Sequence, residues 1–423
     1  MAETLALFGS KPIRTKSYPP HITTGEEEKA AVMRVMDNGI LSDFEGSHNE
    51  WFLGGPEVKA FEREWADYYD CKHAIAVNSA TSGLMAAVGA AAVGPGDEVI
   101  TTPWTMSATP ISVISNNAVP IFCDIDRDTF CMCPDSLEKH ITERTKAIMP
   151  IHIYGHPANM NAIMEIAKAH NLAVIEDAAQ SPGVRYHGTL TGCIGDMGVH
   201  SLNNHKIIQT GEGGIVTTND DDLAERLQLI RNHAEAVIAS GKSVKSLVNM
   251  VGWNYRMNEI EAAIGREQLK KLKGFLEERL SLIQYLNDGI RHLPGLCLPI
   301  LKEGCDHSFY RYPLTIDSSI VKISAPRIVE ALNAEGMDFY AGYQPLNEYP
   351  IYQKMTAFGH QGCPFKCPMY SGKPDYSGNN LTNVSWAREW TFSTEVIHPP
   401  LTANDMDEII QAFEKVWANL DNL

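Results

Sequence analysis

The chain has 423 residues, 44% of them apolar, which is enough for one large domain and a smaller one. Its formal net charge of −17 argues against nucleic acid or an anionic membrane as the main partner, because both call for a basic surface. No apolar run approaches the length of a membrane-spanning helix, and the first residues lack the basic-then-apolar order of a secretory signal.

The first long element is a helix predicted over 56–69. Its sequence, PEVKAFEREWADYY, places Val58, Phe61, Trp65 and Tyr68 on one face at helical spacing. This face is expected to pack on the core of the protein.

Short apolar runs and helical patterns then alternate along the chain. In chain order they predict a strand at 73–79, a helix at 82–94, a strand at 97–103, a helix at 106–116, strands at 119–125 and 147–155, a helix at 159–171 and strands at 172–179 and 197–202. Because the strands are short, apolar and separated by helices, we expect an α/β fold with a mostly parallel sheet covered on both faces.

The second half of the chain predicts a smaller unit behind a helical bridge. The region 257–290 indicates one or two long helices, and the last part of the chain carries a strand-like run at 309–316 and a final helix at 403–420. We therefore divide the chain into an N-terminal arm at 1–20, a large domain at 21–272 and a small C-terminal domain at 273–423.

The nine cysteines are typical of reduced thiols in a cytoplasmic protein, because their number is odd and no signal precedes them. Cys131 and Cys133 form one close pair, and Cys363 and Cys367 form another. Neither pair has the second pair or the histidines that a structural zinc site requires, so we expect no metal.

Ligands of such sheets collect at the carboxyl ends of the strands. Ser79, Ala80 and Thr81 follow the first strand and open a helix, whose free N–H groups and dipole attract anions. An ordinary helix cap is the alternative for these residues. Asp177 ends a later apolar strand, where a carboxylate is either a cap or a functional group.

Lys206 stands in the stretch SLNNHKIIQTGEGG, and its nearest acidic residue is Glu212. This is a poor context for a surface ion pair and favours a lysine held in a pocket. An anion site, a carboxylate and an isolated amine on one rim match pyridoxal phosphate, which needs its phosphate held, its ring nitrogen kept protonated and its aldehyde bound as a Schiff base. A core lysine in a protein without cofactor is the alternative.

Six motifs in order resemble the DegT family of sugar aminotransferases: VNSATSGL, GPGDEVITTPWT, VIEDAAQSPG, SLNNHK, TGEGGIVTTND and NYRMNEIEAAIG. The resemblance covers nearly the whole chain. It implies the aspartate-aminotransferase-like fold type I, with a mostly parallel, mixed seven-stranded sheet flanked by helices in the large domain and a smaller α+β C-terminal domain. It also implies pyridoxal 5'-phosphate as the cofactor.

The resemblance implies that Lys206 holds the cofactor as a Schiff base and moves the proton during transfer. It implies that Asp177 pairs with the pyridine nitrogen. It places Ala80, Thr81 and Ser201 at the phosphate.

Three further positions follow from the same resemblance. Gln180 is expected near the ring hydroxyl or the carboxylate. Asn254 is expected to reach across the interface of a homodimer to the neighbour's phosphate, so that the active sites are shared. Met106 stands where relatives place an aromatic residue on the cofactor ring, and Trp104 is the alternative for that contact.

The activity implied is amino transfer from glutamate or glutamine to a keto-sugar, which can be a nucleotide-linked sugar, a keto-cyclitol or a keto sugar acid. His205 beside Lys206 leaves a sugar dehydratase as an alternative, because relatives with histidine at the reactive position are dehydratases. A non-catalytic, cofactor-binding regulator is the third candidate. In the C-terminal domain, packing roles are expected for four residues that could otherwise contact substrate, namely His307, Tyr310, Tyr343 and His398.

Overall fold

The computed structural model describes residues 3–423, and its centre is a seven-stranded sheet with the order β1-β9-β8-β5-β4-β2-β3. The strands are β1 (His73–Val77), β2 (Glu98–Thr101), β3 (Val119–Phe122), β4 (Thr145–Ile148), β5 (Ala173–Asp177), β8 (Met197–Ser201) and β9 (Gly214–Thr218). Only β9 runs against its neighbours, and the other adjacent pairs are parallel. The mixed, mostly parallel seven-stranded sheet is therefore confirmed.

Eight helices accompany this sheet in the first 240 residues that the structure describes. They are α1 (Glu26–Asn38), α2 (Pro56–Tyr69), α3 (Ala80–Ala90), α4 (Ala108–Ser115), α5 (Pro134–Lys139), α6 (Met160–His170), α7 (Asp221–Arg231) and α8 (Ala234–Ala239). A short hairpin of β6 (Arg185–Tyr186) and β7 (Thr189–Leu190) precedes β8.

Strand β1 shows how the sheet is buried on both faces. Successive strand residues point to opposite faces. Ala74 and Ala76 join the apolar cluster that contains α2, whereas Ile75 and Val77 join the cluster that contains α3 and α7. Both faces are therefore apolar, as the continuous apolar runs of the sequence predicted.

The buried face of α2 differs from the prediction at one position. Trp65 is fully buried, but the next core residue is Tyr69, at 1% exposure, while Tyr68 is 37% exposed. At 100° per residue, position 69 lies closer than position 68 to the direction set by Val58 and Trp65. The prediction of Tyr68 on the buried face was wrong by one residue.

The predicted strand at 147–155 is shorter in the structure. Strand β4 ends at Ile148, and Pro150 follows, which has no N–H group for a ladder. The chain then forms the 3₁₀ turn η2 (Ile153–Gly155), in which Tyr154 has a φ of 59°. This turn brings the Tyr154 region to the carboxyl edge of the sheet.

The C-terminal part contains a second, antiparallel sheet with the order β10-β11-β12. Its elements are β10 (Leu296–Cys297), β11 (Tyr312–Ile316), β12 (Thr391–Thr394), α10 (Ala325–Ala334), α11 (Pro350–Gln353), α12 (Thr382–Trp390) and α13 (Ala403–Trp417), with the 3₁₀ turns η3 (Leu346–Glu348) and η4 (Leu420–Asn422). The arm also reaches this part, because Leu5, just before η1 (Ala6–Phe8), is buried in its core.

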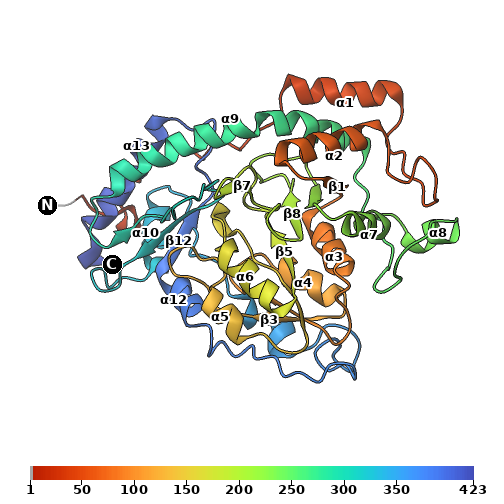
Figure 1. The fold of residues 1–423 in the computed structure, drawn as a ribbon. Helices are drawn as coiled ribbons and strands as arrows, with labels where there is room; N and C mark the ends of the chain where they lie inside the picture. The colour runs from red at the N-terminus through yellow and green to blue at the C-terminus, as the bar shows by residue number, and fades with distance from the viewer. Residues whose placement is uncertain (1–2) are drawn as a thin grey trace.

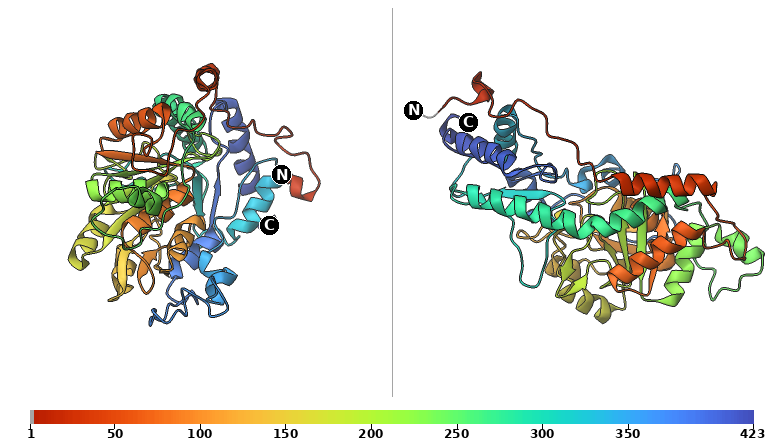
Figure 2. Two further views of the ribbon diagram at one scale, coloured as in Figure 1. Left: turned by 90° about the vertical axis from the view of Figure 1, so that its right-hand side faces the viewer. Right: turned by 90° about the horizontal axis from the view of Figure 1, so that it is seen from above.

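One helix, α9 (Glu259–Ile290), joins the two sheets. Figure 1 shows α9 running along the molecule from α2, beside the large sheet, to α13, beside the small one. Figure 2 shows both ends of the described chain on the side of the small sheet. The domain boundary predicted between residues 272 and 273 falls inside α9, so the two parts share this helix. Across residues 3–423, we find no helix with the length and apolar character needed to span a membrane.

Candidate active site

A cavity of about 260 Å³ lies between the carboxyl ends of β5 and β8, the first turn of α3 and the start of β11. Seven of the eight predicted site residues line it, namely Ala80, Thr81, Met106, Asp177, Gln180, Ser201 and Lys206. The eighth, Asn254, does not line this cavity, and its side chain is exposed near Asn232.

Lys206 lies in the loop between β8 and β9, which a bridge between Asn203 and Gly211 closes. The side chain is only 8% exposed, and its Nζ lies 4.0 Å from the centre of the Tyr310 ring. Within residues 3–423, this amine forms no hydrogen bond and no ion pair. Burial lowers the pKa of Lys206 to about 8, although the negative charge of Asp177 opposes the change. A substantial fraction of the amine is therefore neutral and nucleophilic in mildly alkaline solution.

We expect the low pKa of Lys206 to be measurable in the cofactor-free protein. The neutral form of an amine is the one that reacts, so acetylation of Lys206 by a small reagent should rise with pH and reach half its maximum near pH 8. A peptide lysine in the same tube should reach half its maximum at about pH 10.4. Peptide mass spectrometry reads both, and equal midpoints would contradict the buried environment.

Asp177 is the last residue of β5 and is 5% exposed. Its Oδ2 accepts a hydrogen bond of 2.7 Å from Thr109 Oγ1, and its Oδ1 accepts one of 3.2 Å from the backbone N–H of Ala179. Burial raises the pKa of Asp177, while these two hydrogen bonds and the charge of Lys206 favour the carboxylate. A cationic partner in the cavity would stabilise the carboxylate further.

A buried polar network behind Asp177 holds the end of β5, and it was not predicted from the sequence. Glu176 accepts hydrogen bonds of 2.7–2.8 Å from three backbone N–H groups within 192–195. His152 lies 2.9 Å from Glu176 Oε2 and accepts a bond of 3.0 Å from the N–H of Ala158 at Nδ1, so its Nε2 carries the proton toward Glu176. The backbone N–H of His152 also donates to the carbonyl oxygen of Asp177 at 3.1 Å.

The first turn of α3 has backbone N–H groups that can bind an anion. Ser79 is the N-cap and accepts a hydrogen bond of 3.1 Å from the N–H of Ser82. The N–H groups of Ala80 and Thr81 belong to the first turn, where a helix has no acceptors of its own. A Cβ on Gly214 would lie 2.6 Å from the Ala80 nitrogen, so only glycine lets β9 come this close to the helix end.

Of the two residues considered for the cofactor ring, only Met106 is on the cavity. It lines the cavity and is 61% exposed. Trp104 is fully buried and donates a hydrogen bond of 3.0 Å from Nε1 to the hydroxyl of Tyr154.

Gln180 is fixed by bonds at both ends of its amide. Its Oε1 accepts a hydrogen bond of 2.8 Å from the N–H of Tyr154, and its Nε2 donates one of 3.2 Å to the hydroxyl of Tyr343. Tyr343 belongs to the C-terminal part, so this bond ties the two parts together at the cavity wall.

The four C-terminal residues with expected packing roles divide into two groups. Tyr310 and Tyr343 line the cavity. His307 stacks on Phe309 at 3.8 Å, and His398 packs near His21, away from the cavity lining.

Sequence reasoning assigned no site role to two charged residues of the cavity, Glu212 and Arg311, and it did not consider Arg311 at all. Arg311 lies directly after Tyr310 and just before β11, and it lines the cavity beside Lys206. A single arginine at the start of a strand gives no periodic signal, so only the fold reveals its position.

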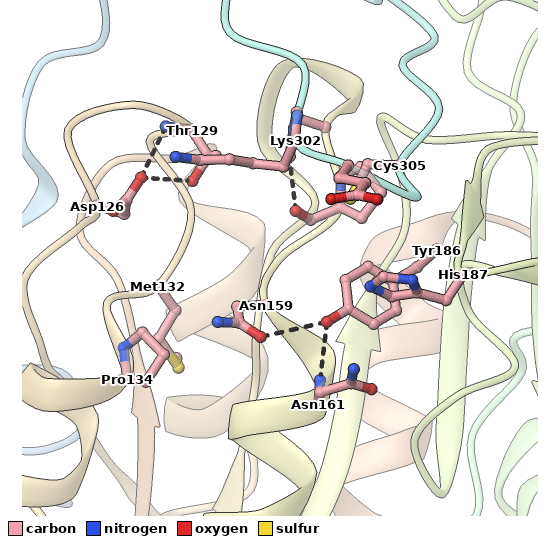
Figure 3. Close-up of a pocket in the computed structure, with 13 residues that line it drawn as sticks. Asp126, Thr129, Met132, Pro134, Asn159, Asn161, Tyr186, His187, Lys302 and Cys305 are labelled. Carbon is pink, nitrogen blue, oxygen red and sulfur yellow. Dashed lines mark hydrogen bonds between the residues drawn. The ribbon is translucent and has the colours of Figure 1, made fainter.

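A second, larger cavity of about 480 Å³ lies near α6 and the β6–β7 hairpin (Figure 3). In it, Tyr186 accepts a hydrogen bond from the N–H of Asn161 and donates one to Asn159. Its lysine, Lys302, is 46% exposed and paired with Asp128. Because this amine is solvated and Asp128 keeps it in its charged form, the smaller cavity around Lys206 is the better candidate for amine chemistry.

The smaller cavity fits pyridoxal phosphate at three points. A buried amine without hydrogen bond or ion pair, among residues 3–423, can take an aldehyde. The buried carboxylate of Asp177 can pair with a protonated ring nitrogen. The crowded N-terminus of α3 can hold a phosphate.

Comparisons with known proteins agree with this fit. Residues 34–365 match the profile of the DegT/DnrJ/EryC1/StrS aminotransferase family. GDP-perosamine synthase of Caulobacter vibrioides is 37% identical over 330 residues, covering 78% of this chain and 85% of that protein. L-glutamine:2-deoxy-scyllo-inosose aminotransferase of Micromonospora echinospora is 31% identical over 435 residues, covering 98% of each.

The fold comparison gives the same answer. The X-ray structure of the aminotransferase from Psychrobacter cryohalolentis superposes with a TM-score of 0.80 at 32% identity, covering 96% of this chain and all of that one. With the profile match over most of the chain and relatives above 30% identity along nearly its whole length, the protein belongs to the DegT/DnrJ/EryC1/StrS family of pyridoxal phosphate-dependent aminotransferases.

Proposed function

We propose that this protein transfers an amino group from an amino-acid donor, glutamate or glutamine, to the ketone carbon of a sugar or sugar-like ring. The observation that carries the proposal is the buried amine of Lys206, without hydrogen bond or ion pair in residues 3–423, on the same cavity as the buried carboxylate of Asp177. An amine and an acid in such surroundings suit the cofactor of the family better than any packing role.

Lys206 is the residue proposed to hold the cofactor and then to move the proton. When bound, pyridoxal phosphate supplies an aldehyde that links to amino groups and a cationic ring that draws electrons from the bond being broken. Once the donor had taken its place on the cofactor, the neutral amine of Lys206 would act as the base that removes the proton from the α-carbon of the donor and then as the acid that gives a proton back. A pKa near 8 suits a group that must both accept and give a proton.

Asp177 is proposed to keep the ring nitrogen protonated, because an adjacent negative charge favours the cationic form. The hydrogen bond from Thr109 fixes its carboxylate in the direction of the cavity edge. Gln180, held by Tyr343, is proposed to meet the ring hydroxyl or the substrate carboxylate. Met106 is proposed to cover the ring face.

The phosphate is proposed to lie at the first turn of α3, held by Ala80 and Thr81 and by the hydroxyl of Ser201. Asn254 is proposed to complete this site in the neighbouring subunit of a homodimer. Its exposed side chain, away from its own chain's cavity, supports that arrangement. The homodimer and a cytoplasmic location stay predictions.

The names of relatives support the proposed substrates. One relative is named a GDP-perosamine synthase, another an L-glutamine:2-deoxy-scyllo-inosose aminotransferase, and a third a dTDP-3-amino-3,4,6-trideoxy-alpha-D-glucose transaminase. A nucleotide-linked keto-sugar and a free keto-cyclitol are thus both represented, and glutamine is named as a donor. The common feature is a ketone on a polyhydroxylated ring.

The dehydratase alternative depends on a histidine at the reactive position. His205 is exposed and its Nδ1 lies 3.2 Å from the side-chain oxygen of Asn204, whereas Lys206 is buried. This difference supports lysine, and therefore amino transfer, at the reactive place.

The two half-reactions test the proposal separately. The full-length protein is loaded with pyridoxal phosphate and mixed with L-glutamate or L-glutamine, and we expect the keto acid and pyridoxamine phosphate to form in equal amounts. A panel of nucleotide-linked and free keto-sugars should then return the cofactor to its first form with an amino-sugar as the product. Loss of water from the sugar would support the dehydratase, and no reaction with either donor would support the regulator.

A further inference from the structure

Arg311 and Glu395 are the charged groups that the small sheet places beside the cavity. Strands β11 and β12 pair antiparallel, with Tyr312 opposite Thr394. Arg311 precedes Tyr312 and Glu395 follows Thr394, so the two are the next cross-strand neighbours beyond the ladder. The pairing of β11 with β12 thus places Arg311 and Glu395 side by side at the edge of the small sheet that faces Lys206.

The guanidinium of Arg311 contacts one aromatic ring and one carboxylate. Its Cζ lies 5.0 Å from the centre of the Tyr343 ring, and its Nε lies 3.4 Å from Oε2 of Glu395. The same Nε is buried and has no hydrogen-bond acceptor among residues 3–423. An ion pair without a hydrogen bond leaves donors of the guanidinium free for another acceptor.

Glu395 is able to leave this pair at low cost. Its side chain is 36% exposed, against 20% for that of Arg311. The carboxylate of Glu395 accepts no hydrogen bond from any group in the described part of the chain. If it turns toward water, it loses one partly screened ion pair and gains hydration.

The proposed function explains why Arg311 would need a partner that can leave. The donor carries an α-carboxylate, whereas a keto-sugar ring carries none, and the two substrates occupy one cavity in turn. A half-buried arginine that bound the donor carboxylate would be left unpaired when the sugar entered, and a charge that is largely removed from water is costly without a partner. If a carboxylate of the protein pairs with the arginine whenever the donor is absent, the arginine is never left unpaired.

We propose that Arg311 binds the α-carboxylate of the amino-acid donor and that Glu395 takes its place when the carboxylate-free acceptor is bound. The inference rests on the proposed function for its biological meaning, and its geometry rests on the cavity alone. Arg311 lies beside Tyr310, which is 4.0 Å from the amine of Lys206, so a carboxylate on Arg311 would hold the donor's amino group in the region of that lysine. The exchange makes one pocket suitable for a donor that carries an α-carboxylate and for an acceptor ring that carries none.

The test measures binding of two compounds that have no amino group and cannot react. Glutaramate has the carboxylate and amide of glutamine, and glutaramide is its neutral counterpart. Isothermal titration calorimetry on the full-length, cofactor-loaded protein should show glutaramate binding more tightly than glutaramide. Arg311→Gln should weaken glutaramate binding by about tenfold or more and leave glutaramide unchanged. Glu395→Gln should tighten glutaramate binding by about two- to fivefold, because the competing carboxylate is gone.

Two further variants keep the result interpretable. Arg311→Lys keeps the charge but loses the planar fork, so it should fall between the parent protein and Arg311→Gln. Arg388→Gln changes an exposed arginine of α12 that pairs with Glu348, and should match the parent. Equal loss of both compounds in Arg311→Gln, or weaker glutaramate binding in Glu395→Gln, overturns the inference.

The outcome is separable from that of the proposed function. If glutaramate shows the expected pattern but neither donor converts the cofactor, the carboxylate site stands and the proposed amino transfer fails. If the donors react while glutaramate binding does not depend on Arg311, the transfer stands and the carboxylate exchange is wrong.

Discussion

Replacement of Lys206 by alanine should lower the rate of amino transfer by about 10⁴-fold or more. A positioned acid–base group contributes about 10²–10⁴ in rate, and the same residue is proposed to hold the cofactor covalently. The measurement is single-turnover conversion of the loaded protein by L-glutamate or L-glutamine. Borohydride reduction followed by peptide mass spectrometry should find the cofactor attached to the peptide of Lys206 in the parent and no attachment in the variant.

Lys270→Ala is the matched control, because Lys270 is a 61% exposed lysine of α9 that pairs with Glu267. It should leave both the rate and the attachment unchanged. Transfer by Lys206→Ala at the parent rate, or attachment at another lysine, would end the assignment of Lys206.

Asp177→Asn should slow the donor half-reaction by about 10- to 1000-fold. A neighbouring carboxylate raises the pKa of a cationic partner by about 1–3 units, and the amide cannot hold the ring proton in the same way. The rate of the variant should also begin to fall at a lower pH than that of the parent, because the ring nitrogen gives up its proton at a lower pH. The rate of conversion of bound cofactor by L-glutamate, measured across pH, gives both results.

Asp220→Asn makes the same change at the exposed N-cap of α7, where asparagine caps equally well, and should leave the rate unaltered. A rate in Asp177→Asn equal to that of the parent would show that Asp177 has a purely structural role. Cofactor content measured in each variant separates slow chemistry from weak binding.

The fold and the centre of the site could be predicted because local patterns carry them. Continuous apolar strands such as that ending in Asp177 indicated a buried sheet, and the lysine at 206 without a nearby acidic partner indicated a pocket. Both features depend on residues close together in the chain. The structure places Asp177 and Lys206 on one cavity, as that pattern predicted.

The features that were missed depend on contacts between distant segments. Arg311 reaches the cavity only because β11 pairs with β12 at one register, and His152 is buried only because the chain turns away after β4. Tyr69 is different, because helical spacing from Val58 and Trp65 already favours it over Tyr68, and the prediction placed the buried face one residue too early. The contacts of Arg311 and His152 have no signature in the local sequence.

Helix α9 has a mechanical consequence for the cavity. It is 32 residues long, about 48 Å, and buries Leu269 and Leu272 beside the large sheet and Ile283 and Leu286 beside the small one. Moving the two sheets apart would expose the apolar residues of α9 to water. We therefore expect no hinge within this helix. Without a hinge, the wall that carries Lys206 and the wall that carries Arg311 should keep a constant spacing. The proposed exchange of partners at Arg311 would then need only side-chain rotation and no closure of the two parts.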